Sequence, residues 1–125
     1  MFSRLHHVAI IVSDYQKARS FYVDILGLPV LRENVRPDKQ DCKLDLQLSG
    51  CELELFYKPN SPARPTYPEA CGLRHLAFAV QDVEQAVCYL HSKGVEPQPI
   101  RYDEFSGKRF AFCFDPDGLP IELHE

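Results

Sequence analysis

Residues 7–14 read HVAIIVSD, and residues 75–82 read HLAFAVQD. Both stretches follow the pattern H-x-A-x-x-V-x-D, in which a histidine precedes an apolar run and an aspartate ends it. His75 lies 68 residues (75 − 7) after His7. Runs rich in Val, Ile and Phe are typical of β-strands, so the two stretches predict two equivalent strands.

A second pair of segments keeps the same spacing. LEL at 53–55 corresponds to IEL at 121–123, which places Glu122 68 residues (122 − 54) after Glu54. A spacing shared by separate segments indicates an internal repeat, in which one structural module occurs twice. We therefore predict a single domain over residues 1–125, with a first module at about 4–57, a linker at 58–72 and a second module at about 73–125.

Length and charge limit the classes of function. A chain of 125 residues is the size of one domain, and its formal net charge of −4 gives no electrostatic basis for binding nucleic acid or an anionic membrane. No apolar run approaches a membrane span, and the N-terminus MFSRLHH lacks the apolar segment of a signal peptide. We expect a cytoplasmic protein that acts on a small molecule.

The cysteines argue against a disulfide framework and against a structural zinc site of the zinc-finger type. Their number is odd, they are widely scattered, and no C-x-x-C motif is present. We expect most of them to be small buried apolar side chains. The five are Cys42, Cys51, Cys71, Cys88 and Cys113.

The first half of the chain reads β-α-β-β-β. A strand over 5–13 leads to a helix over 15–26, which Ser13 or Asp14 can cap and Gly27 ends. Three strands are expected next, at about 29–36, 43–48 and 51–57.

The second half repeats this order. A strand over 73–80 leads to a helix over 83–93, with Asp82 as its N-cap. Strands are then expected near 95–101, 109–114 and 119–124. The linker 58–72 carries four prolines, so it cannot form a helix or a central strand, and its length indicates a lid, a dimer arm or an exchange of modules.

Strand alternation assigns the polar residues to one face of the predicted sheet. The bulky apolar side chains share the face under the helices, which leaves His7, Glu54, His75 and Glu122 on the opposite, inner face. Two carboxylates there would repel each other unless a cation balanced them. Two neutral imidazoles and two carboxylates match the charge of one divalent ion, such as zinc, nickel, cobalt, manganese or iron.

Two other histidines compete for this role. His6 is adjacent to His7, but it lies on the other strand face and its counterpart in the second module is Arg74. His124 shares the face of Glu122, where it would be a partner of a ligand or a substitute for one.

Several motifs in this order carry a family resemblance. They are LHHVAIIVSD, ARSFYVDILGL, LELFY, RHLAFAV and FDPDGLPIEL, and together with the repeat they cover nearly the whole chain. The chain resembles the vicinal oxygen chelate superfamily, most closely its glyoxalase I branch. The resemblance implies an α+β fold in which two βαβββ modules form a curved mixed sheet around one metal ion.

The resemblance also implies a chemistry. The ligands of the divalent ion, zinc or nickel before the other candidates, would be His7, Glu54, His75 and Glu122. The site would be shared between the subunits of a homodimer. The metal would act as a Lewis acid that stabilises an enediolate. Glu122 would move the proton as general base and then general acid, and Glu54 would be the equivalent carboxylate of the first module.

This chain departs from glutathione-dependent glyoxalase I at two positions. That enzyme has an Arg where this chain has Ile11, and an Asn where it has Lys58. In that enzyme both residues bind the glutathione portion of the substrate, so their replacement here argues against glutathione. The residues that we would test as anchors of an anionic substrate are Lys58, Arg64, Lys108 and Arg109.

The sequence thus predicts a metal-dependent lyase or isomerase whose substrate is a small α-oxo or α-hydroxy carbonyl compound or the adduct of such a compound with a thiol. The alternatives are a fosfomycin-type thiol transferase, against which Glu54 argues, and a bleomycin-resistance-type binding module without a metal. Ring-cleaving dioxygenases also resemble the chain, but they lack the fourth ligand.

Overall fold

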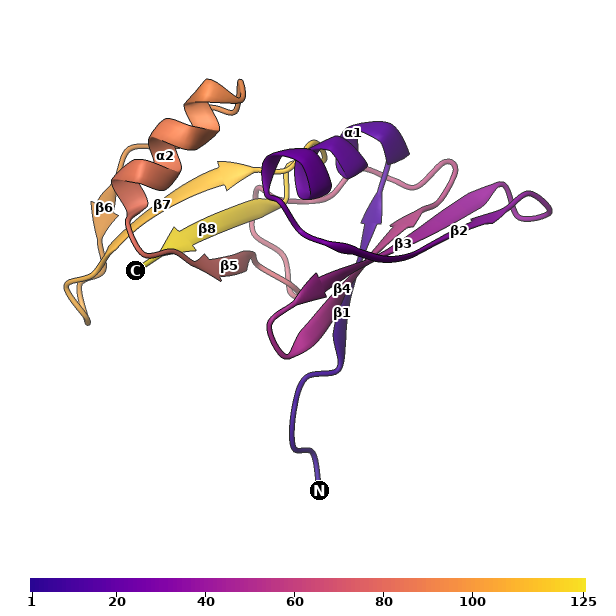
Figure 1. Ribbon diagram of the computed structural model, residues 1–125, viewed down its shortest axis with the longest axis horizontal. Helices are drawn as coiled ribbons and strands as arrows, with labels where there is room; N and C mark the ends of the chain where they lie inside the picture. The colour runs from indigo at the N-terminus through magenta and orange to yellow at the C-terminus, as the bar shows by residue number, and fades with distance from the viewer. The chain divides into compact units, whose positions relative to one another are not determined.

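The computed structural model describes all residues from Met1 to Glu125, which form two compact units, Met1–Ala63 and Arg64–Glu125. Each unit contains one four-stranded mixed sheet and one helical segment (Figure 1). The strand order is β1-β4-β3-β2 in the first unit and β5-β8-β7-β6 in the second. The same order in both units agrees with the repeat seen in the sequence.

In the first unit, one strand precedes a helical segment in the sequence and three strands follow it. The elements are β1 (His7–Val12), α1 (Tyr15–Arg19), η1 (Ser20–Ile25), β2 (Val30–Arg36), β3 (Asp41–Leu48) and β4 (Cys51–Tyr57). β1 pairs in parallel with β4, and β3 is antiparallel to both β2 and β4. The expected helix therefore exists, but its second part is a π-helix rather than an α-helix.

The second unit repeats these elements with shorter strands. They are β5 (Leu76–Ala79), α2 (Val83–Ser92), β6 (Arg101–Tyr102), β7 (Arg109–Phe114) and β8 (Pro120–His124). β5 pairs in parallel with β8, and β7 is antiparallel to β6 and β8. The prediction of a strand near 95–101 is wrong, because only Arg101 of this segment lies in a strand, β6. Pro97 and Pro99 lack the N–H groups that a strand ladder needs.

Equivalent aspartates begin the two helical segments. The side chain of Asp14 accepts a hydrogen bond from the Lys17 backbone N–H, and Asp82 accepts one from the Gln85 N–H, both at 3.0 Å. These caps satisfy backbone donors that a helix N-terminus otherwise leaves without partners. The final aspartate of the repeated motif therefore has a structural role.

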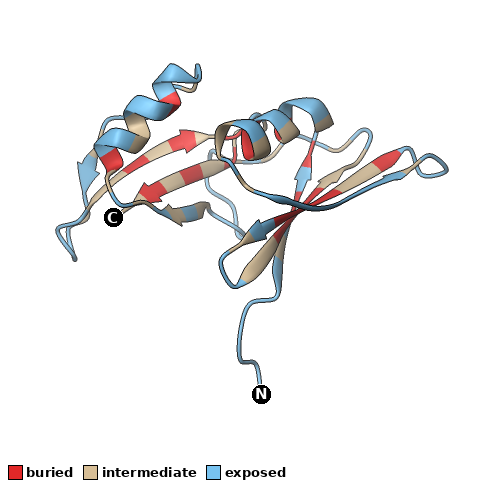
Figure 2. Cartoon of the chain, in the orientation of Figure 1, coloured by how far each residue is buried: buried red, intermediate tan, exposed pale blue.

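The core of each unit is the apolar strand face that alternation predicts. Leu53 and Leu55 on β4 are buried, as are Ile121 and Leu123 on β8. Buried and partly exposed residues alternate along β7 and β8 (Figure 2). The opposite faces carry the polar residues of the candidate site. The helix α2 packs against β7 and β8.

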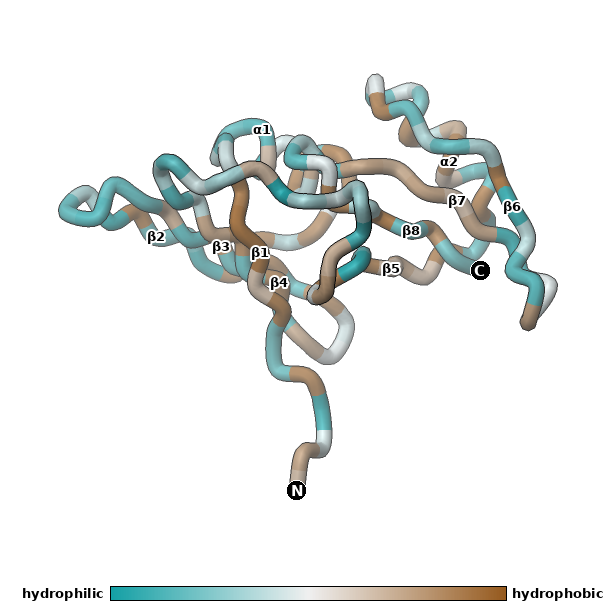
Figure 3. The backbone as a smooth tube through the Cα atoms, turned by 180° about the vertical axis from the view of Figure 1, so that it is seen from behind, coloured by the Kyte–Doolittle hydropathy of each residue, from teal (hydrophilic) through white to brown (hydrophobic).

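Hydropathy follows the same division. Along β1 the chain is mostly hydrophobic, whereas the turn between β2 and β3 is hydrophilic (Figure 3). No helix combines the length and the apolar character that a membrane-spanning helix requires. All five cysteines are free, and only Cys113 is buried, so the expectation that most would be buried is wrong. Burial raises the pKa of the Cys113 thiol to about 11.

Candidate functional site

The first unit places His7 beside Glu54. His7 opens β1 and Glu54 lies on the neighbouring β4, two residues beyond Glu52, which is the register partner of His7. Their closest atoms, His7 Nε2 and Glu54 Oε2, are 3.8 Å apart. His7 is exposed, while Glu54 is 9 % exposed, so the pair stands at the surface of the inner sheet face.

The second unit contains the equivalent pair. His75 precedes β5 directly, and Glu122 lies in β8, the strand that pairs in parallel with β5. His75 Nε2 and Glu122 Oε2 are 2.9 Å apart. The His75 ring also meets the Phe112 ring edge to face, with 5.2 Å between the centroids, which fixes the imidazole from its other side.

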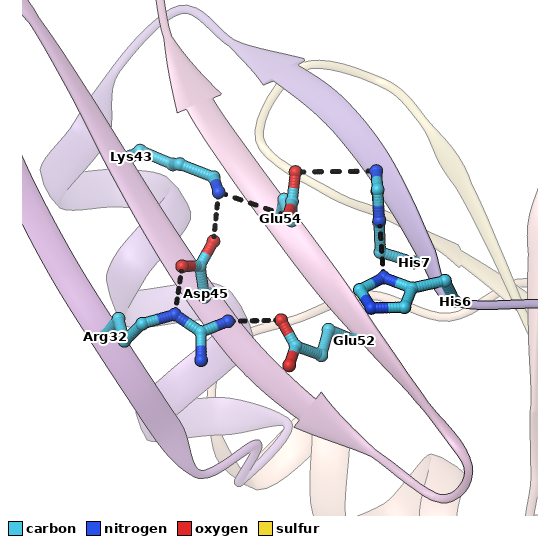
Figure 4. A network of polar contacts seen from close by, with 7 residues as sticks. All are labelled: His6, His7, Arg32, Lys43, Asp45, Glu52 and Glu54. Carbon is cyan, nitrogen blue, oxygen red and sulfur yellow. Dashed lines mark hydrogen bonds and ion pairs between the residues drawn. The ribbon is translucent and has the colours of Figure 1, made fainter.

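A network of charged side chains extends across the first sheet from Glu54 (Figure 4). Lys43 Nζ lies 3.1 Å from Glu54 Oε1 and 3.2 Å from Asp45 Oδ1. Arg32 Nε donates to Asp45 Oδ2 at 2.9 Å, and its guanidinium also donates to Glu52. Asp45 is almost fully buried, so the two cations supply the charge that its carboxylate would otherwise obtain from water.

The ammonium of Lys43 is held in its charged form. Its burial acts to lower its pKa, but hydrogen bonds and charges from Glu54 and Asp45 outweigh that effect, and the pKa is raised above its ordinary value. Glu54 therefore has two basic neighbours, Lys43 and His7. Glu122 has a single ion-pair partner, His75.

Neither of the two competing histidines forms an ion pair with Glu54 or Glu122. His6 precedes β1 and its Nδ1 is 2.9 Å from His7 Nδ1, so it contacts the imidazole rather than the carboxylate of the first pair. His124 Nδ1 is 2.7 Å from the Glu125 carbonyl oxygen, and its Nε2 is 4.0 Å from Asp103 Oδ2. It therefore faces Asp103 rather than Glu122.

The donor atoms of each pair fit two neighbouring ligands of one metal ion. Ligand atoms about 2.1 Å from a cation and at right angles to each other are roughly 3 Å apart. The pairs, at 2.9 and 3.8 Å, are close to that separation. Neither unit gathers three or more His, Cys, Asp or Glu side chains that could hold a metal ion, so each unit contains one His–Glu pair only.

The basic residues proposed as substrate anchors have different surroundings. Lys58 Nζ is 3.1 Å from Asp41, and Arg64 donates to the carbonyl oxygens of Leu73 and Arg74. Arg109 donates twice to Glu125, whose pKa it lowers, and it also pairs with Glu84. These contacts engage all three cations within the fold. The Lys108 backbone N–H donates to Ser106 Oγ.

The sequence analysis missed two arginines, Arg74 and Arg101, that line one pocket with the candidate ligand His75. A pocket in the second unit, of about 240 Å³, is lined by Arg74, His75, Gln98, Arg101 and Phe112 among others. Arg74 precedes the repeated histidine directly, so its position in the sequence was a usable signal. Arg101 was treated as the end of an expected strand, and nothing in its spacing links it to His75.

Comparisons with known proteins point to one family. The family model described as Glyoxalase/Bleomycin resistance protein/Dioxygenase superfamily matches residues 4–123. An uncharacterized protein of Bacillus subtilis, YwkD, is 54% identical over 97% of this chain and 95% of its own length.

Solved structures agree with this match. The structure of a glyoxalase family protein from Enterococcus faecalis is 56% identical, with a TM-score of 0.91 over 99% of this chain and 98% of that one. The trypanothione-dependent glyoxalase I of Leishmania major is 32% identical, with a TM-score of 0.74 over 99% of this chain and 87% of that one. The two βαβββ modules and the mixed sheets thus match the glyoxalase fold.

Proposed function

The chain belongs to the Glyoxalase/Bleomycin resistance protein/Dioxygenase superfamily, and we propose that it is a metal-dependent lyase or isomerase of the glyoxalase I type. Its substrate would be a small compound with a carbonyl group beside an oxo or hydroxy carbon, or the adduct of such a compound with a thiol. The observation that carries this proposal is the duplicated His–Glu pair, at 3.8 Å in one unit and 2.9 Å in the other.

We propose that His7, Glu54, His75 and Glu122 hold one divalent cation, with zinc or nickel as the first candidates. Neutral imidazoles and carboxylates suit these ions, and two carboxylates match their charge. The cation would supply positive charge for the oxygens of a substrate that loses a proton from carbon. Since each unit offers half of the ligand set, the proposal requires both units, from one chain or from two.

Glu122 is the carboxylate that we assign to proton transfer. Lys43 Nζ lies 3.1 Å from Glu54 Oε1, so an ion pair within the sheet holds the Glu54 carboxylate in place. Glu122 has no ammonium neighbour, and the imidazole of His75 is its partner. A carboxylate that is held less firmly is better suited to take a proton from one carbon and return it to the next.

The surroundings of Ile11 and Lys58 bear on which thiol the substrate would contain. Ile11 is 55 % exposed and offers no charge to a peptide, and Lys58 is paired with Asp41. A substrate with the two carboxylates of glutathione would have to compete with Asp41 for Lys58. We therefore propose a substrate other than the glutathione adduct.

An assay of the metal-loaded protein tests this proposal. Methylglyoxal with each of several thiols, and a set of α-hydroxyketones, would be incubated in D₂O and followed by proton NMR. The proposal predicts conversion, or exchange of a carbon-bound proton for deuterium, with at least one substrate, and no such reaction with His75→Ala. A protein that binds these compounds but exchanges no proton would be a binding module, which would overturn the proposal.

A further inference from the structure

Arg101 is unusual among the arginines of the two sheets because no carboxylate accompanies it. Arg32, Arg36 and Arg109 each pair with one or more acidic side chains. Arg101 instead has its guanidinium carbon 5.0 Å from the centroid of the Phe110 ring and 5.6 Å from that of Phe112. Cation–π contacts of this kind position a guanidinium and leave its N–H donors available.

The second unit places this free cation next to His75. Phe112 contacts both groups, with its ring centroid 5.6 Å from the Arg101 guanidinium carbon and 5.2 Å from the His75 centroid. Both residues line the same pocket. A ligand in this pocket can therefore contact both His75 and Arg101.

Among the charged residues that line the pocket, Arg101 has no ion-pair partner. Arg74 also lines the pocket, but its Nε donates to Glu69, which is a further lining residue. The backbone N–H of Gln98 donates to the Phe112 carbonyl oxygen at 2.7 Å, which ties the segment before β6 to β7. Gln98 thereby brings a neutral donor and acceptor to the same pocket.

We propose that Arg101 binds an anionic group of the substrate, a carboxylate or a phosphate, a few bonds away from the oxygens presented to His75. This inference rests on the proposed function and narrows its substrate class to small α-oxo or α-hydroxy compounds that carry an acid group. The guanidinium offers paired N–H donors that match the oxygens of either anion. Phe112 and Phe114, at the wall of the pocket, exclude water around the connecting carbons.

The first test uses the metal-free protein, so it does not depend on the proposed catalysis. The Nε–H signal of Arg101 is followed by NMR during titration with inorganic phosphate and with acetate, at constant ionic strength. A saturable shift of this signal, absent when sodium chloride is added instead, supports the proposal. No saturable shift with either anion would overturn it, whether or not the protein binds a metal.

The second test uses calorimetry to compare the affinities of matched neutral and anionic compounds for the metal-loaded protein. The pairs are hydroxyacetone with 3-hydroxypyruvate, and dihydroxyacetone with its phosphate. We expect at least one anion to bind about tenfold more tightly than its neutral counterpart, since a hydrogen bond between two charged groups stabilises more than one between neutral groups. The pair that shows the preference identifies the carboxylate or the phosphate as the group.

Substitution then assigns the preference to one side chain. Arg101→Gln should remove the preference for the anion and leave the metal affinity unchanged. Arg4→Gln is the matched control, because Arg4 is an exposed arginine in the other unit. A preference that survives Arg101→Gln, or that falls equally in Arg4→Gln, would overturn the assignment. Absence of metal binding would refute the proposed function alone, because the metal-free titration still decides this inference.

Discussion

Glu54 and Glu122 occupy equivalent positions in the two halves of the chain, yet their charged neighbours differ. Glu54 lies between the ammonium of Lys43 and the imidazole of His7. Glu122 forms its ion pair with His75, and the charge of Arg74 also acts on it. The repeat thus supplies two similar carboxylates, and Lys43 makes them unequal. Lys43 has no basic counterpart in the second unit, because the residue 68 positions later is Ala111.

Replacing the proposed proton carrier should separate binding from turnover. Glu122→Gln should keep substantial metal, because three ligands remain, and should lose about 100-fold or more in kcat, the usual contribution of a general base. Metal content and turnover are measured on the same preparation. Glu104→Gln, an exposed glutamate of the same unit, is the control. Full activity of Glu122→Gln would show that the base is assigned wrongly.

Removing Lys43 should strengthen metal binding. The ammonium lies 3.1 Å from a proposed ligand oxygen, so its charge opposes a cation there. In Lys43→Gln we expect the metal affinity to rise by roughly tenfold, about 1.4 kcal/mol. Calorimetric titration of the metal-free proteins measures the change, with Lys39→Gln, an exposed lysine in a turn, as the control. Equal or weaker binding by Lys43→Gln would contradict the electrostatic role of Lys43.

The individual site residues were predictable to different degrees. Strand alternation and the repeat were sufficient to assign His7, Glu54, His75 and Glu122 to one sheet face, because both rules depend on sequence spacing alone. The pairing of β1 with β4 and of β5 with β8, which brings each histidine to its glutamate, is seen in the structure. The partners of the basic residues were not predictable, because they depend on three-dimensional contacts. Arg64 and Arg109 are bound to carbonyl oxygens and to Glu125, while the unpaired Arg101 lies at the pocket.

At the scale of the strands, the charged residues also stabilise the first sheet. Arg36 donates twice to Asp41 at 2.6 Å, and Lys58 adds a third contact to the same buried carboxylate. The hydrogen bonds from Arg36, followed by that from Lys58, lower the pKa of Asp41 against the opposing effect of its burial. These contacts join the end of β2 to the start of β3 and to the residue after β4.

The stabilising effect of Asp41 should depend on pH. Because its pKa is lower in the folded state, the carboxylate stabilises the fold above its ordinary pKa, near 3.8, and loses this effect as the pH falls through the folded value. Asp41→Asn should therefore have a Tm several degrees below that of the unsubstituted protein at neutral pH. The difference should shrink on acidification.

Thermal unfolding at neutral and acidic pH measures this difference. Asp38→Asn is the matched control, since Asp38 is an exposed aspartate in the adjoining turn. A deficit of Asp41→Asn that stayed constant down to acidic pH would mean that the ion pairs are not its cause.

Most elements followed from the sequence, and the exceptions have physical causes. β4 and β7 have the predicted bounds because alternating apolar residues and turns delimit them. The segment 95–100 forms no strand because of its prolines. The π-helix at Ser20–Ile25 was not predictable, because its apolar residues fit a helical face with either hydrogen-bond pattern.

At the scale of the molecule, the duplication divides the proposed metal site into equal parts. Each unit contributes one histidine and one glutamate, so neither completes the site alone. In the homodimer that the family resemblance implies, the first unit of one chain would meet the second unit of its partner. The alternative is a site that closes within one chain, and the two arrangements predict different behaviour of mixed dimers.

Mixing two defective chains distinguishes these arrangements. His7→Ala damages the first unit, and His75→Ala damages the second. If the site is shared between chains, a heterodimer of the two variants contains one site with both damaged halves and one fully intact site. We expect co-expressed, doubly tagged heterodimers to regain one metal ion per dimer, while each variant alone binds little. Heterodimers without metal would show that the site closes within a chain.

The most direct test of the account is the amount of metal that the protein binds and the residues on which binding depends. Protein purified without chelators, then titrated with zinc, nickel and cobalt, should bind one equivalent per chain. His7→Ala and His75→Ala should each lose this binding, while His91→Ala, a histidine paired with Glu96, should keep it. Stoichiometric binding that survives both substitutions, or no binding by the unsubstituted protein, would contradict the account.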